Sequence, residues 1–260
     1  MAALDRLKDD PQGAIKELLY KMADDQLIIG HRNSEWTGIG PVLEEDIAFS
    51  SIAQDKVGQS YQLYQMLEKL GEGHPDTTAF TRNEVDFKSC HLVEYPIREY
   101  DFSLIRHFLF DHAELLRFDM LRQSSYEPLA QYAGKGYGEV KYHVFHANQW
   151  IKQLSEGNEE SRARLQSALK EALPLAFGIF EPGPFEEQLT QDKIFAGEEA
   201  LLERWVNLIS EKLEKTALEM PNFEEVEPSV GGRYGSHTDH LQPMLEEMGA
   251  VFRTDPSAEW

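Results

Sequence analysis

The regular spacing of apolar residues along most of the chain is the feature that most restricts its fold. Six long segments repeat apolar residues at intervals of three and four, which places them on one face of an α-helix. We expect helices over residues 11–32, 43–70, 101–123, 128–154, 159–177 and 198–218, and a short one over 240–248. No stretch alternates in the manner of a strand. The sequence therefore predicts an all-α fold.

Three glycines inside the fourth predicted helix, Gly134, Gly136 and Gly138, leave two interpretations open. Glycine lowers helix stability by about 1 kcal/mol relative to alanine. Closely spaced small residues let a neighbouring segment approach the helix, whereas the alternative is a kink or a break at this point. Residues 72–100 contain the breakers His74-Pro75 and Tyr95-Pro96, and we expect a long connection with short helical pieces there.

Charge and cysteine usage restrict the class of protein. The formal net charge is −21, which argues against nucleic acid and anionic membranes as partners, because both attract clustered Lys and Arg. The single cysteine, Cys90, excludes an internal disulfide. No run of 18 apolar residues occurs, and residues 1–10 lack a signal-peptide core. We expect a cytoplasmic protein with neither a nucleic-acid nor a membrane partner.

The chain contains no Glu-x-x-His sequence. Helical bundles that hold two irons take one Glu from each of two helices and a Glu-x-x-His from each of the other two. None of the nine histidines here has a carboxylate three residues before it. A bundle that lacks these ligands is typical of a partner subunit rather than of the catalyst.

Polar residues nevertheless interrupt three of the predicted helices near their middles, over residues 54–59, 110–114 and 138–143. Residues three or four apart share a helix face. Three pairs have this spacing: Lys56 with Gln59, Asp111 with Glu114, and Glu139 with His143. The sequence therefore predicts polar groups inside the bundle.

Several motifs carry a resemblance to a known family. Residues 231–248 read Gly-Gly-Arg-Tyr-Gly-Ser-His-Thr-Asp-His-Leu-Gln-Pro-Met-Leu-Glu-Glu-Met. Further matches are Gly-His-Arg at 30–32, Ser-Glu-Trp at 34–36 and Thr-Ala-Phe-Thr-Arg at 78–82. The acidic and imidazole residues also follow the family's order: Glu44, Asp46, Asp55, Asp111, Glu139 and His143. On these residues the chain resembles the C subunits of the phenylacetyl-CoA 1,2-epoxidases.

This resemblance implies a ferritin-like fold and a place in a multi-subunit monooxygenase. It implies one domain over residues 1–260, with a four-helix core bundle at about 12–155 and additional C-terminal helices and a tail at about 159–260. In such complexes a homologous A subunit holds the di-iron site and binds the coenzyme A thioester. A small B subunit and a reductase with flavin and an iron–sulfur cluster complete the assembly. The C subunit has no cofactor of its own and is structural.

The resemblance also assigns positions to the ligands of a di-iron site. The first-helix carboxylate falls at Gln26, and the second-helix Glu-x-x-His falls at Lys56 and Gln59. Asp111 keeps the third-helix carboxylate. The fourth-helix Glu-x-x-His falls at Val140 and His143, with Glu139 nearby. We therefore expect no metal, and we expect the Lys56 ammonium to take the place of the metals and to pair with Asp111 or Glu139, because a buried charge needs a partner.

The motif at the carboxyl-terminal end of the chain offers a second candidate site. Gly231, Gly232 and Arg233 form either a plain turn or a phosphate-binding loop of backbone amides and a guanidinium. Together with His237 they are candidates for contact with the partner subunit or with coenzyme A. We expect Thr238 or Asp239 to cap the last helix.

The sequence is also compatible with two other functions. One is an independent, metal-dependent oxygenase that uses Asp111, Glu114, Glu139 and His143, since these residue types bind metals. The other is a separate interaction or storage protein of the same fold. The absent Glu-x-x-His favours the structural subunit over both.

Overall fold

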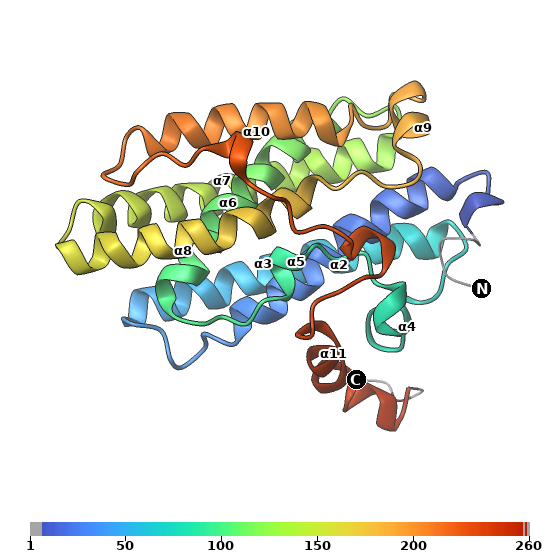
Figure 1. Ribbon diagram of the computed structural model, residues 1–260. Helices are drawn as coiled ribbons and strands as arrows, with labels where there is room; N and C mark the ends of the chain where they lie inside the picture. The colour runs from blue at the N-terminus through green and yellow to red at the C-terminus, as the bar shows by residue number, and fades with distance from the viewer. Residues whose placement is uncertain (1–6, 257, 259–260) are drawn as a thin grey trace.

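The regular structure in the described part of the chain is entirely helical. The structure is a computed structural model, and it describes residues 7–256 and 258. Four long helices form the central bundle: α2 (Gly13–Ser34), α3 (Leu43–Lys69), α6 (Tyr100–Leu121) and α7 (Glu127–Ser155). The all-α, ferritin-like prediction is confirmed (Figure 1).

The remaining helices extend the bundle and connect its halves. They are α4 (Pro75–Phe80), α5 (His91–Glu94), α8 (Glu159–Phe177), α9 (Glu186–Gln191), α10 (Glu198–Leu213) and α11 (Leu241–Gly249). Helices α8 and α10 pack against α6, while α4 and α5 lie in the long connection predicted between α3 and α6. The chain after α10 crosses back over the bundle toward α2, and α11 lies beside α4 (Figure 1).

Apolar residues from all four long helices meet in one core. Ile28 of α2, Leu63 of α3, Leu109 of α6 and Val140 of α7 are completely buried there. Burying one such side chain stabilises the fold by about 1.5–3 kcal/mol. The bundle is therefore held by a continuous apolar core into which the polar groups described below are inserted.

Helix α7 is continuous through its three glycines. A Cβ atom at Gly136 would lie 2.8 Å from the ring of Phe118, so this glycine admits a neighbouring helix closely. Gly134 and Gly138 have no such reason, because no atom of the described residues lies within 4 Å of a Cβ at either position. At Gly136 it is the Phe118 side chain of α6, and not a neighbouring backbone, that packs closely on α7, and the predicted alternative of a break is wrong.

Two predicted features near the carboxyl-terminal end are corrected. The helix expected over 198–218 ends at Leu213, where the Thr216 hydroxyl donates a 2.7 Å hydrogen bond to the Leu213 carbonyl and closes the last turn. The N-cap residue of α11 is His240, whose side chain makes no capping hydrogen bond, and the Thr238 hydroxyl accepts only a long one, 3.4 Å, from the His240 amide. Thr238 instead donates through its amide and its hydroxyl to Glu94, at 2.9 and 2.8 Å.

No helix in the described part of the chain is long and apolar enough to span a bilayer.

Candidate functional site

A buried ion pair lies at the centre of the bundle. The Lys56 ammonium on α3 is 2.7 Å from a carboxylate oxygen of Asp111 on α6, and neither side chain is exposed to solvent. The ammonium also lies 5.0 Å from the centre of the Phe110 ring. Burial opposes ionisation of Asp111, but the charge of Lys56 and the contact with His107 outweigh it and hold the pKa of this carboxyl well below its usual range.

His107 connects this ion pair to α2. Its Nδ1 lies 2.9 Å from the second carboxylate oxygen of Asp111, and its Nε2 lies 2.9 Å from the Asn33 side-chain oxygen. Burial lowers the pKa of His107 to about 4, so the ring is neutral at physiological pH. Asp111 therefore has one oxygen in an ion pair with an ammonium, without a hydrogen bond, and the other within hydrogen-bond distance of an imidazole.

The next polar contact along the bundle joins Gln26 to Glu114. The Gln26 amide donates a hydrogen bond to Glu114, whose other oxygen lies 3.4 Å from the Arg117 guanidinium. Burial raises the pKa of Glu114 above its usual range even though Arg117 opposes the shift. The amide at Gln26 acts here as a hydrogen-bond donor to the carboxyl group.

The polar residues of α7 are joined to α3. His143 Nε2 lies 3.0 Å from Asp55, and the Gln59 amide donates to Glu139 at 2.9 Å. Glu139 therefore contacts Gln59, and it is Asp111 that pairs with Lys56. Val140 is completely buried and apolar, so it offers no ligand.

The structure thus brings the predicted positions together but with a donor set that does not suit two irons. Iron in such bundles takes carboxylate and imidazole donors. Here a lysine contacts the retained carboxylate, and amides stand at two further positions. Within the described residues, no group of three or more His, Cys, Asp or Glu side chains is arranged to hold a metal ion.

The loop at residues 231–233 binds anionic groups of this chain. The amides of Gly231 and Arg233 donate to the Glu181 carboxylate at 2.8 and 3.1 Å. The Arg233 guanidinium is fully buried and donates to both oxygens of Asp25, at 2.8 Å each. Of the two alternatives, the contacts favour the turn: the loop is an internal anchor that ties the chain after α10 to α2.

Two neighbours of this loop explain its shape. A Cβ atom at Gly232 would lie 2.1 Å from the Ser89 carbonyl oxygen, so a larger residue does not fit. His237 Nδ1 lies 2.7 Å from Glu94, and neither side chain is exposed. His237 is consequently turned into the protein, and its imidazole is not presented to a partner or a ligand.

Sequence reasoning missed part of the buried polar network. Glu198 of α10 binds Arg117 and Lys21, with contacts of 2.6 and 2.5 Å. Burial opposes its ionisation, but the two cations lower the pKa of Glu198 to about 2. These residues are far apart in the chain, and no local pattern indicates their contact. His107, by contrast, stands four residues before Asp111, and that helical spacing is a usable signal.

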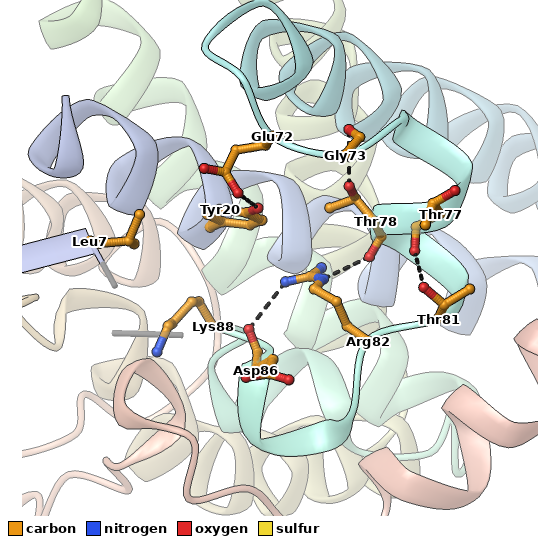
Figure 2. A pocket seen from close by; sticks show the side chains of 10 residues that line it. All are labelled: Leu7, Tyr20, Glu72, Gly73, Thr77, Thr78, Thr81, Arg82, Asp86 and Lys88. Carbon is orange, nitrogen blue, oxygen red and sulfur yellow. Dashed lines mark hydrogen bonds between the residues drawn. The ribbon is translucent and has the colours of Figure 1, made fainter. Parts of the chain in front are cut away.

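A surface cavity of about 420 Å³ lies between α2 and α4 (Figure 2). Arg82 crosses it and is already paired: its guanidinium contacts Asp24 at 2.5 Å and lies 4.0 Å from the centre of the Phe87 ring. The cavity is thus lined by Lys88 and by Arg82, and the charge of Arg82 is balanced within the chain.

Fold and site together define a ferritin-like helical bundle whose centre holds a lysine–aspartate pair. Residues 1–260 match the model of a family described as phenylacetic acid catabolic protein, and the chain belongs to that family. The chain is similar to the C subunit of the 1,2-phenylacetyl-CoA epoxidase of Escherichia coli (strain K12), with 30% identity over 241 residues. The alignment covers 92% of this chain and 96% of that relative.

Proposed function

We propose that this chain is the non-catalytic, structural C subunit of a phenylacetyl-CoA 1,2-epoxidase complex of aerobic phenylacetate degradation. Its partners in the proposal are a homologous di-iron A subunit, a small B subunit and a reductase with flavin and an iron–sulfur cluster. The complex inserts one atom of dioxygen into the aromatic ring as an epoxide and reduces the other to water. We place this assembly in the cytoplasm.

The observation that carries the proposal is the Lys56–Asp111 contact. A positive side chain, completely buried, stands where the resemblance puts a metal ligand, and it neutralises the one carboxylate retained there. An ammonium repels divalent iron and binds the oxygen that iron would need. The centre therefore keeps the charge balance of the bundle without a metal, which suits a subunit that supports the catalyst.

The same contacts give the proposed role a physical basis. A catalytic constellation needs its supporting helices held rigidly. Polar contacts link the helices of this bundle in pairs. They include the fully buried Lys56–Asp111 pair between α3 and α6 and the partly exposed His143–Asp55 pair between α7 and α3. A partner packed against such a bundle meets a surface that resists deformation.

The alternative of an independent oxygenase receives no support from the geometry. Its four candidate ligands each have a different partner: Asp111 contacts Lys56, Glu114 binds Gln26, Glu139 binds Gln59 and His143 lies against Asp55. They do not converge on one point as a metal requires.

Reconstitution of the epoxidase tests the proposal. The di-iron homologue, the small B subunit and the reductase of the proposed complex are assayed with phenylacetyl-CoA, with and without this chain. We expect dioxygen-dependent epoxidation only when the chain is present, and none from the chain with the reductase alone. Turnover by the chain without the di-iron homologue, or full turnover in its absence, contradicts the proposal.

A further inference from the structure

One face of the bundle carries exposed apolar residues and is not covered by the described part of this chain. Along α3, exposed or half-exposed residues follow each other at intervals of four, three, four, three and four: Leu43, Ile47, Ser50, Gln54, Val57 and Tyr61. Such spacing forms the straight seam by which one helix packs on another. We call this seam and the adjoining surface of α7 the α3–α7 face.

Helix α7 continues the same face. Gly138, Tyr142, Phe145 and Gln149 are exposed or half-exposed and follow at intervals of four, three and four. Phe145 is 60% exposed and Tyr142 is 54% exposed, although aromatic side chains of this size normally lie in cores or interfaces. The contacts Asp55–His143 and Glu45–His146 join α3 to α7, so the two helices that carry these seams are neighbours.

Charge is depleted along the α3 seam, whereas α7 carries Glu139 and Lys141 beside its exposed aromatic residues. The chain has a net charge of −21 and 27% charged residues. Between Ile47 and Gln65 of α3, however, the only charged residues are Asp55 and Lys56, and both are paired inside the chain. Depletion of charge together with exposed aromatic residues is the composition of an interface core.

Glycines on the face have no packing role among the described residues. Gly58, Gly134 and Gly138 are helical, and no described atom lies within 4 Å of a Cβ at any of them. Each lowers helix stability by about 1 kcal/mol relative to alanine, so an external reason is needed for their presence. Close approach of a helix from another chain supplies it. A groove of about 680 Å³ between α2 and α3, bordered by Val57 and Tyr61, offers space for the side chains of that helix.

We propose that the α3–α7 face is the docking surface for the homologous di-iron subunit. This inference rests on the function proposed above. Residues 43–61 extend over about 28 Å, and two adjacent helices are about 20 Å wide. The resulting projection of roughly 600 Å², enlarged by the ridges of the surface, approaches the ~800 Å² that each partner contributes to a stable interface. A second copy of this chain is disfavoured because it brings the same −21 charge.

Two substitutions on the face and one control test the inference. Phe145→Glu places a charge in the interface, and Gly138→Leu fills the space that the partner's helix needs. Gly138→Leu has no neighbour to clash with among the described residues, so its melting temperature stays the same or rises. Val251→Glu is the matched control, because Val251 is 64% exposed and lies outside the face.

Binding to the purified di-iron homologue is measured by isothermal titration calorimetry at micromolar concentration, with the oligomeric state followed by light scattering. We expect each face variant to weaken binding about 30-fold or more, as for interface hot spots, and the control to bind as the wild type does. Face variants that bind normally while the wild type also binds overturn the proposal, because the partner then uses another face. A wild-type chain that does not bind at all contradicts the proposed function itself. Loss of a homodimer, rather than of the complex, assigns the face to a second copy and overturns the proposal.

Discussion

Replacing Lys56 by methionine is the perturbation whose effect can be worked out most fully from the structure. Methionine fills most of the volume of the lysine side chain but has no charge. In the Lys56→Met variant the Asp111 carboxylate, which is completely buried, loses the ammonium 2.7 Å away. Removing one partner of a buried pair costs about 3–5 kcal/mol, because the remaining charge stays in a medium of low polarity.

A second variant separates this effect from simple damage to the core. Lys56→Met combined with Asp111→Asn removes both charges and retains a side chain able to hydrogen-bond with His107. Replacing a whole buried pair with neutral groups is often close to neutral. We therefore expect the double variant to regain most of the lost free energy of unfolding, to within about 1–2 kcal/mol of the wild type.

Urea unfolding followed by circular dichroism measures all three proteins. The wild-type pKa of Asp111 is depressed, so the stability from this group is present above the unfolded-state pKa and is lost as pH falls through the folded-state value. In Lys56→Met, protonation of Asp111 removes the unpaired charge, and its deficit relative to the wild type narrows as the pH is lowered. The reasoning is refuted if the free energy of unfolding of Lys56→Met is less than about 1 kcal/mol below that of the wild type and this difference does not shrink at low pH.

Three further outcomes follow from the same structure. Arg233→Ala leaves Asp25 buried without its guanidinium and lowers the free energy of unfolding by about 3–5 kcal/mol in the same urea assay. Its control is Arg204→Ala, which breaks an exposed pair with Asp119 and changes the free energy of unfolding by less than about 1 kcal/mol. Gly136→Ala forces a methyl group against Phe118 and destabilises by about 1–3 kcal/mol, while Gly134→Ala stabilises by up to about 1 kcal/mol in thermal unfolding. The pKa of His107 is lowered from 6.5 to about 4, so the unfolded chain takes up a proton at this ring before the folded protein does. The contribution of His107 to the free energy of unfolding is therefore complete above pH 6.5 and declines as the pH falls toward 4. A His107→Gln variant whose free energy of unfolding follows the same pH profile as the wild type contradicts this assignment.

The spacing of apolar residues predicts the long helices because each of them buries one apolar face. Helix α8 begins and ends at the residues that the spacing predicts, 159 and 177, and α3 begins at the predicted Leu43. The end of α10 lies five residues before the predicted one, because the Thr216 hydroxyl closes the helix by a local hydrogen bond that apolar spacing does not register. The sequence does not predict α9, a single six-residue segment that is too short to show a period.

The candidate site is predictable where helical spacing or family positions determine it. Lys56 and Asp111 occupy positions that the resemblance assigns to metal ligands, and they meet in the structure. Contacts between distant segments have no such signal. Arg233 and Asp25 are 208 residues apart, and only the folded path of the chain after α10 brings the guanidinium to α2. The loop sequence alone therefore leaves a turn and a ligand-binding loop open, and the long-range contact with Asp25 shows an internal anchor.

The metal content of the purified chain tests the central claim most directly. Iron, manganese and zinc are measured by elemental mass spectrometry after incubation with ferrous iron, for the chain alone and for its complex with the di-iron homologue. If Lys56 replaces the metals, the isolated chain holds far less than one equivalent, and iron appears only with the complex. Two irons bound to the isolated chain contradict this account and make the chain an oxygenase in its own right.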